Sequence, residues 1–355
     1  MTTIATRYIA STVMTYILLA LLLVVGIDLI FAFVRELKYT SDHYSIIQVL
    51  EYLMLTVPRR VYGVFPMSSL LGAVMGLGLL ASHSELIVMR AAGLSLMGIV
   101  RAVLQLALIL AVFLVLVGEF LLPKTEYWAE SLRATSRGNA QATLTAQGAW
   151  VKDGNFFIHI DKAFPGGYLS GVTRYEVNDD QRLVSVVYSD HAQLEKGAWQ
   201  LKQASYIDLQ KNPLQQQQLS VLGWSSTVAP NLLAILVSDP ENLSLRGLAS
   251  YIQYLKENHL DASIYQLNFW QKIFQPFSLI VMLFLAVIFI FGPLRTATLG
   301  LRLLAGVITG FGFYIVNQVF GPFSLVYHWP PALAAILPSV LFALLGLVIL
   351  KSRKV

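Results

Sequence analysis

Six long apolar stretches constrain this chain more than any other feature of its sequence. Each is long enough to cross the hydrocarbon core of a bilayer, which takes about 20 apolar residues in a helix. The predicted spans are residues 13–34, 61–81, 94–122, 273–291, 299–320 and 331–350. The chain has 355 residues, 56% of them hydrophobic and only 13% charged, a composition outside the usual soluble range. We therefore predict an integral membrane protein with six transmembrane helices.

The segment between the third and fourth spans has a different character. Over residues 123–268, short runs of aromatic and β-branched residues alternate with turn residues, beginning at Asp153-Gly154. This pattern predicts an antiparallel β domain, with a loop at residues 215–218 and an amphipathic helix over 245–258. The predicted domains are 1–122 with spans one to three, 123–268 with the β domain, and 269–355 with spans four to six.

One strand of that domain shows the alternation clearly. Phe156, Ile158 and Ile160 share one face, and Phe157 and His159 share the other. A shift of one residue exchanges the two faces, so the pattern leaves open which of them is buried. His159 is interpreted as a structural residue rather than a ligand, because no other histidine accompanies it.

A short helix over residues 83–92 is predicted between spans two and three. Ser82 and Glu85 have the spacing of a capping box, and Gly93 is a typical residue at a helix end. About ten residues at roughly 1.5 Å each cannot cross a core of about 30 Å. The helix must therefore lie along the membrane face or dock on a partner. Its candidate contact residues are Glu85, Leu86, Met89 and Arg90.

The distribution of Lys and Arg near the span ends predicts the orientation. The basic residues on the side of the short helix are Arg7, Arg90, Arg101, Arg295, Arg302, Lys351, Arg353 and Lys354. Those on the other side, leaving out the β domain, are Arg35, Lys38, Arg59 and Arg60. The positive-inside rule then places both termini and the short helix in the cytoplasm and the β domain outside.

Catalysis by this chain alone is not indicated. The sequence contains no phosphate-binding G-x-x-x-x-G-K-[ST] motif, no H-E-x-x-H and no G-x-S-x-G. It also contains no cysteine, which excludes disulfides and thiolate metal sites. We expect no catalytic residues, no cofactor and no metal site.

Charged residues near the outer membrane surface are the other candidates. Arg35 and Lys38 follow span one, where cations meet lipid phosphates or an anionic substrate, although snorkelling anchors have the same pattern. Asp28 and Glu119 lie within spans, where an ionisable side chain suggests a functional role such as proton transfer. Both lie toward the outer ends of their spans, which favours a simpler explanation.

Three long segments resemble the permease family of the lipopolysaccharide export ABC transporter, LptF/LptG. They are FPMSSLLGAVMGLGLLASHSELIVMRAAG, KIFQPFSLIVMLFLAVIFIFGPLR and FYIVNQVFGPFSLVYHWPPALAAILPS. The resemblance extends over essentially the whole chain. It implies a multi-pass protein of the bacterial inner membrane with a periplasmic, jellyroll-like β domain, and no nucleic-acid partner.

The resemblance also implies partners and site residues. The expected partners are an LptF-like paralogous permease, an LptB-like ATPase dimer, an LptC-like periplasmic protein and lipopolysaccharide. The short helix corresponds to the coupling helix of the family, with Glu85 as the acid that engages the ATPase. The basic cluster after span one corresponds to Lys38, with Arg35 nearby. Ala32 and Tyr39 stand where some relatives have lysine.

Two other classes of function are compatible with the residues alone. The first is a secondary transporter driven by protons, which would need Asp28 or Glu119 and would respond to a pH gradient rather than to ATP. The second is a membrane anchor whose β domain is a scaffold. The function that the resemblance supports is that of a permease that extracts lipopolysaccharide and passes it through the β domain.

Overall fold

A computed structural model of the chain describes residues 2–40, 44–136, 149–164, 168–178, 182–195, 198–210, 215–224, 240–291 and 297–352. It divides into two compact units. The helical unit comprises Met1–Arg35, Thr56–Leu122 and Ala262–Val355. The β unit comprises Glu36–Leu55 and Pro123–Asp261. The segment 36–55, which follows span one in the sequence, therefore folds with the β unit.

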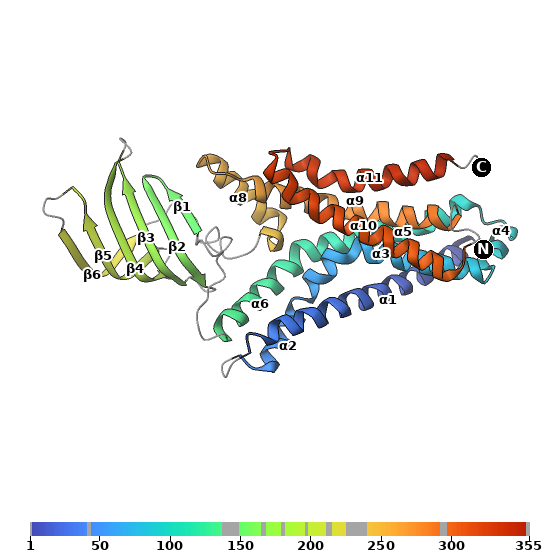
Figure 1. Cartoon of the computed structure of the whole chain (residues 1–355), viewed down its shortest axis with the longest axis horizontal. Helices are drawn as coiled ribbons and strands as arrows, with labels where there is room; N and C mark the ends of the chain where they lie inside the picture. The colour runs from blue at the N-terminus through green and yellow to red at the C-terminus, as the bar shows by residue number, and fades with distance from the viewer. Residues whose placement is uncertain are drawn as a thin grey trace. The chain divides into compact units, whose positions relative to one another are not determined.

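The helical unit is built from long apolar helices (Figure 1). Its elements are α1 (Thr2–Leu37), α3 (Val57–Ser82), α4 (Glu85–Ala91), α5 (Leu96–Leu116), η1 (Val117–Leu121), α9 (Ser263–Phe291), α10 (Leu299–Val326) and α11 (Pro331–Ser352). Within the described chain, six helical segments are long and apolar enough to cross a membrane, which confirms the predicted number. Several are longer than the apolar stretches because polar residues continue the helix. For example, α9 begins at Ser263, ahead of the predicted start at 273.

The core of this unit forms around α3 and α9. Of the 18 consecutive residues that are most apolar in each helix, 72% are buried in α3 and 61% in α9, but only 17% in α10. Gly72 and Gly76 let α3 approach α1 closely: a Cβ on Gly72 would overlap the backbone of Ile17, and one on Gly76 would lie 3.1 Å from Cα of Val13. Small residues at this spacing permit two helices to approach one another closely.

The β unit contains one antiparallel sheet with its strands in sequential order. The strands are β1 (Ala149–Asp153), β2 (Phe156–Phe164), β3 (Tyr168–Val177), β4 (Leu183–Glu195), β5 (Ala198–Asp208) and β6 (Gln215–Trp224). The helices are α2 (Ile46–Leu55), α6 (Leu122–Ser136), which enters the unit at Pro123, the short η2 (Pro240–Asn242) and α8 (Leu245–Glu257). The predicted antiparallel β domain is confirmed. The jellyroll-like closure implied by the resemblance stays a prediction.

The sheet shows which of the two faces is buried. Ile158 and Ile160 are 0% and 1% exposed, whereas Phe157 is 38% exposed. The face with Ile158 and Ile160 therefore packs into the core of the unit, together with Val172 and Val187 of the neighbouring strands. The alternation predicted from the sequence is confirmed, and the open choice between its two faces is decided.

Two local predictions about the β unit have different outcomes. The amphipathic helix is confirmed as α8, and the hydroxyl of its Tyr254 donates to the carbonyl of Lys152 in β1 at 2.8 Å. The predicted loop at residues 215–218 is wrong, because these glutamines form the first half of β6. Their backbone pairs with β5, and Gln216 donates to the hydroxyl of Ser205 at 2.8 Å. β propensity depends strongly on context, and pairing with β5 places these glutamines in a strand here.

Candidate functional site

The short helix α4 joins α3 to α5 at one end of the helical unit (Figure 1). It covers Glu85–Ala91, slightly less than the predicted 83–92. The predicted capping box is wrong, because Ser82 still belongs to α3 and its hydroxyl donates to the carbonyl of Leu79 at 2.8 Å. Instead, Ser84 has a positive φ of 59°, which turns the chain sharply into the new helix.

The predicted contact residues of α4 point in different directions. Leu86 is 3% exposed and belongs to the core of the helical unit, and Met89 packs against that core. These two side chains therefore anchor α4 to the bundle. Ile87 and Val88 are each 65% exposed and form the apolar surface that remains available to a partner.

Glu85 is held at this surface by two neighbours. Its carboxylate lies 3.8 Å from Nδ1 of His83 and forms a side-chain hydrogen bond with Tyr8 of α1. The Glu85 side chain is still 34% exposed. The first turns of α1 and α4 are thus linked through a carboxylate that a partner cation can also reach.

Arg35 and Lys38, the two cations predicted near the outer membrane surface, are both exposed. Arg35 lies in the last turn of α1, and Lys38 follows Leu37 directly. The turn after α1 is closed by backbone bonds from Tyr39 to Glu36 at 3.0 Å and from Thr40 to Leu37 at 3.2 Å. Among the residues that the structure describes, no hydrogen bond or ion pair involves the side chain of Arg35 or Lys38. Both charges are therefore available to an anion.

The intramembrane acid Asp28 forms an ion pair that was not predicted from the sequence. Its carboxylate accepts a hydrogen bond from Arg60 of α3, whose Nε also donates to Thr56 at 3.2 Å. The Arg60 side chain is 11% exposed and the Asp28 side chain 43%. Arg60 therefore pairs with α1, and Asp28 is not an unpaired acid within its span. Asp28 and Arg60 lie toward the same end of two spans that follow one another in the sequence. Matching opposite charges at similar depths in neighbouring spans would have indicated this pair.

A second polar cluster surrounds Tyr62 of α3. Glu119, in the widened turn η1, interacts electrostatically with Tyr62, and Nζ of Lys272 in α9 lies 5.8 Å from the Tyr62 ring centroid. A Cβ on Gly118 would lie 2.8 Å from that ring, so the glycine makes room for it. Lys272 is only 7% exposed. The sequence pattern does not single out Lys272, because this residue precedes the apolar stretch of α9.

Arg302 of α10 is not the surface cation that the count of basic residues assumed. It is 4% exposed, and its guanidinium donates to the carbonyl of Gly78 in α3. The absence of a side chain on Gly78 leaves room for the contact, since a Cβ there would lie 3.2 Å from Cδ of Arg302. Of the other basic residues predicted at this end, Arg295, Arg353 and Lys354 lie outside the described residues.

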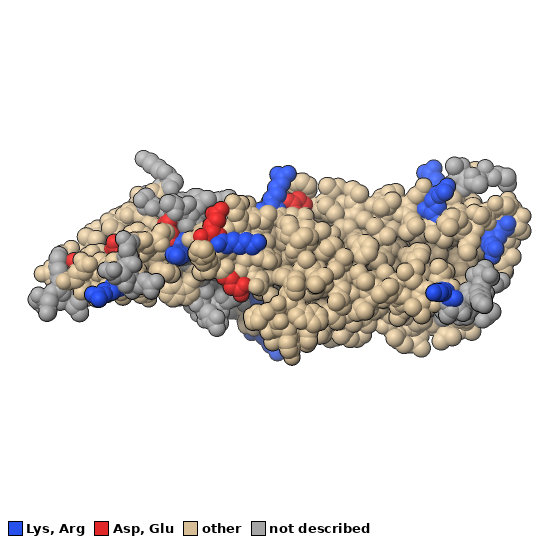
Figure 2. Space-filling view, turned by 90° about the horizontal axis from the view of Figure 1, so that it is seen from above, with Lys and Arg blue, Asp and Glu red and all other residues tan. Residues whose placement is uncertain are grey.

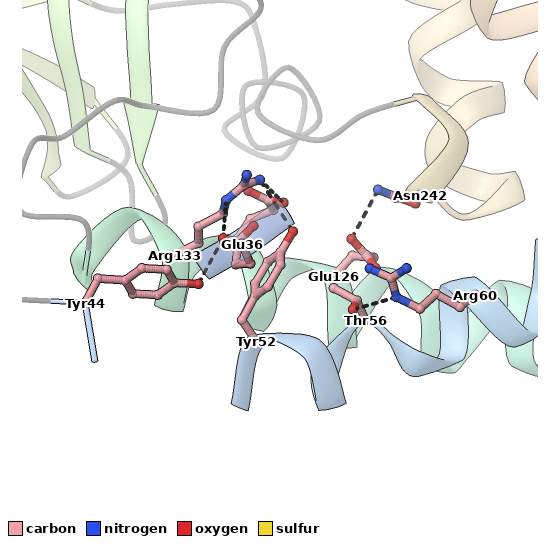
Figure 3. A network of polar contacts seen from close by, with 9 residues as sticks. Glu36, Tyr44, Tyr52, Thr56, Arg60, Glu126, Arg133 and Asn242 are labelled. Carbon is pink, nitrogen blue, oxygen red and sulfur yellow. Dashed lines mark hydrogen bonds and ion pairs between the residues drawn. The ribbon is translucent and has the colours of Figure 1, made fainter. Parts of the chain in front are cut away.

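Within the β unit, Arg133 of α6 connects segment 36–55 to the helix (Figure 3). Its Nε lies 3.4 Å from the carboxylate of Glu36, and its Nη1 donates to the hydroxyl of Tyr52 at 3.4 Å. Tyr44 donates to the same carboxylate at 3.0 Å. Burial disfavours the Arg133 charge, but Tyr52, Glu36 and Glu130 outweigh it and raise the pKa of Arg133. This network is structural.

The buried face of the sheet also carries a charge. Arg174 lies with its guanidinium carbon 4.8 Å from the Phe156 ring centroid, and burial lowers its pKa although Glu176 opposes that shift. On the other face, Nδ1 of His159 lies 3.1 Å from Asp161, and its ring lies 4.8 Å from that of Trp150. These contacts account for His159 as a structural residue. Among the described residues, no three or more side chains are grouped to hold a metal ion.

Six helices long and apolar enough to span a membrane, a short helix at one end of the bundle and a β domain between the third and fourth spans define a multi-pass membrane protein. The chain belongs to the family of lipopolysaccharide export system permeases LptF/LptG, whose model matches residues 7–352. The family suggested by the sequence motifs is confirmed.

The relatives give the likeness more detail. The chain is 40% identical over 352 residues to the lipopolysaccharide export system permease protein LptG of Escherichia coli K12, covering 98% of both chains. It is 35% identical over 339 residues to the LptG of Haemophilus influenzae, covering 95% of both. Of the two paralogues in the family name, the sequence segments resemble LptG more than LptF, in agreement with these relatives.

Proposed function

We propose that this chain is the LptG-type permease subunit of a lipopolysaccharide export ABC transporter in the bacterial inner membrane. The observation that carries the proposal is the family match, which runs through all six spans and the inserted β domain. In this role the chain extracts lipopolysaccharide from the outer leaflet and passes it through the β domain. A separate ATPase supplies the energy.

The ATPase site of the proposal is α4. Its free apolar surface consists of Ile87 and Val88, with Glu85 and Arg90 at either end of the helix. A short amphipathic helix of this kind fits a groove of a partner protein. An LptB-like ATPase dimer binds there, and an LptF-like permease completes the membrane part.

The substrate site of the proposal begins at Arg35 and Lys38. Two exposed cations without partners among the described residues suit the phosphates of lipopolysaccharide. The acyl chains then pass along the buried face of the sheet around Ile158 and Ile160 toward an LptC-like periplasmic protein.

The orientation that we propose for the chain in the membrane places both termini in the cytoplasm and the β unit in the periplasm. It is supported by the basic side chains at the α4 end of the helical unit, where Figure 2 shows Lys and Arg without acidic neighbours on the face in view. The sequence has no cysteine, so single cysteines at Ile87 and Gln210 are the only thiols in the chain. A membrane-impermeant thiol reagent applied to spheroplasts labels Gln210→Cys and not Ile87→Cys. The reverse pattern contradicts the orientation.

The test of function is reconstitution. The chain is purified with its co-expressed partner subunits, placed in proteoliposomes with lipopolysaccharide, and supplied with either ATP or a pH gradient. Release of lipopolysaccharide to an acceptor requires ATP and is unaffected by the gradient. Release that follows the gradient without ATP would instead support the proton-driven transporter.

A further inference from the structure

A groove of about 610 Å³ opens between α5, α9 and α11 in the helical unit. It lies where α5 begins and where α9 and α11 end, which is the end that carries α4. Its lining includes Met97 of α5, Leu350 of α11, and Phe284, Val287, Ile288 and Phe291 of α9. The four from α9 follow the spacing of one helix face, so the groove runs along the last two turns of that helix.

The lining of the groove suits a hydrocarbon chain. Ser95 is its one polar residue, and the Ser95 hydroxyl already accepts a hydrogen bond from the amide of Gly98 at 3.1 Å. A stable buried water needs about two to four hydrogen-bond partners, and this lining offers few of them. The groove therefore favours an apolar occupant over water. The volume falls within the range of about 300–1,000 Å³ typical of small-molecule sites. At the depth of the terminal turns of membrane spans, the molecules at hand are lipids.

Two cations directly follow lining residues of the groove in the sequence, Arg101 after Val100 and Lys351 after Leu350. Arg101 lies one turn after Met97 on the same face of α5, and helix geometry tilts its side chain back toward the start of the helix, at the membrane edge. Lys351 follows Leu350 in the last turn of α11. Both side chains are exposed, and neither makes an ion pair or hydrogen bond within the described residues.

Negative charge is scarce around these cations. Among the described residues of the turns at this end, Glu85 is the only acid, and Tyr8 and His83 already contact it. Figure 2 shows basic side chains gathered at this end of the helical unit and no acidic one on the face in view. An apolar groove whose lining is followed by two cations, neither of them paired among the described residues, matches an acyl chain attached to an anionic headgroup.

We propose that the groove between α5, α9 and α11 binds one acyl chain of an anionic glycerophospholipid from the leaflet at the α4 end, with its phosphate held by Arg101 and Lys351. The groove lies at the end of the bundle where α1 begins. Arg35 and Lys38 lie at the other end of α1, so the proposed phospholipid site is separate from them. The proposal does not rest on the proposed function, because it concerns a resident phospholipid rather than the transported lipid.

The experiment uses the full chain with its co-purified subunits in nanodiscs that contain a trace of phospholipid with a diazirine in its acyl chain. One arm carries a phosphatidylglycerol probe and the other a phosphatidylcholine probe with the same chains. After illumination, mass spectrometry of peptides locates the labelled residues. Met97→Trp fills the groove, and the pair Arg101→Gln and Lys351→Gln removes its cations. Ile109→Trp, an equally exposed position of α5 outside the groove, and Arg7→Gln, a cation of α1 at the same end, are the matched controls.

We expect the phosphatidylglycerol probe to label the groove residues at least fivefold more than the phosphatidylcholine probe. Met97→Trp lowers that labelling several-fold, the double charge variant brings the ratio of the two probes close to one, and the controls change neither. Equal labelling by both probes in the unaltered chain would overturn the proposal, as would an equal loss in Ile109→Trp. Labelling that survives both Met97→Trp and the charge variant would also overturn it.

Discussion

The carboxylate of Glu85 links α4 to α1 through its contact with Tyr8. It contacts Tyr8 and His83 and still presents a third of its surface to a partner. If it binds an Arg or Lys of the ATPase, its loss leaves that cation poorly paired, at a cost of roughly 1–3 kcal/mol. Glu85→Ala should therefore reduce the amount of ATPase that co-purifies with the chain, or uncouple ATP hydrolysis from lipopolysaccharide release.

Ser82→Ala is the matched control for this variant. The Ser82 hydroxyl donates to Leu79 inside α3 and does not cap α4, so its removal should change neither quantity. Glu85→Gln keeps the shape of the side chain without its charge and should behave like Glu85→Ala. Normal ATPase recovery and normal release in both Glu85 variants would contradict the role of this acid.

We expect Lys38 to contribute to the binding of lipopolysaccharide. An exposed lysine near an anionic headgroup contributes about 1 kcal/mol, which is roughly fivefold in occupancy. Lys38→Ala should lower the lipopolysaccharide that co-purifies by about that factor, and Lys38→Glu by more, because it adds repulsion. The difference should shrink from low salt to high salt as screening increases. Equal occupancy in the two variants, measured by mass spectrometry, would favour a snorkelling anchor.

The ion pair between Asp28 and Arg60 predicts an effect on stability. Asp28→Ala leaves the guanidinium of Arg60, which is 11% exposed, with Thr56 as its remaining hydrogen-bond partner among the described residues. Because Asp28 itself is partly exposed, we expect a loss of about 1–2 kcal/mol, near the lower end for a charged group left unpaired. The melting temperature in detergent should fall, and Arg60→Met in addition should restore part of it. An unchanged melting temperature in the single variant would show that the pair contributes nothing.

At the scale of elements, the contact between α1 and α3 depends on glycine. A methyl group on Gly72 would overlap the backbone of Ile17, and backbone cannot move aside as a flexible side chain does. Gly72→Ala should therefore lower stability by about 1–3 kcal/mol, the usual cost of overpacking. Gly63 lies in the same helix, and a methyl group there would have nothing within 4 Å, so Gly63→Ala should be neutral or stabilising. Thermal unfolding of both variants in one detergent tests this difference, and equal melting temperatures would exclude a role for the close approach.

The sheet gives the second element-scale prediction. If the β unit conducts lipid, a photo-crosslinker at Ile158, on the buried face, should capture lipopolysaccharide only when ATP and the ATPase are present. The same crosslinker at Phe157, on the other face of β2, should not. Because the two positions are adjacent, they differ in little except the face. Capture that does not need ATP, or equal capture at both positions, would leave the sheet as a scaffold.

At the scale of the whole molecule, the sequence predicted the features that solvent dictates. A bilayer requires long apolar helices, so six spans followed from length and composition. A half-buried strand requires alternation, so the pattern of β2 followed as well. The choice of buried face did not follow, because it depends on which element covers the sheet.

The contacts that the sequence missed join residues far apart in the chain. Arg302 was counted as a surface cation because nothing local shows that Gly78 offers it a carbonyl. Lys272 was overlooked because its neighbour Tyr62 belongs to a different span. Leu86 and Met89 were assigned to a partner, whereas the bundle itself contacts both. A single sequence shows that a side chain needs a partner but not which partner the fold supplies.

The glycine contact between α1 and α3 has a mechanical consequence. The backbones of α1 and α3 approach so closely at Gly72 that we expect the two helices to move together as one rigid rod. The carboxylate of Glu85 ties α4 to the first turns of α1, while the turn at His83 and Ser84 joins α4 directly to α3. A load applied at α4 thus reaches both helices of the rod at the same end. We expect α10 to follow the rod, because Arg302 of α10 donates to the carbonyl of Gly78 in α3.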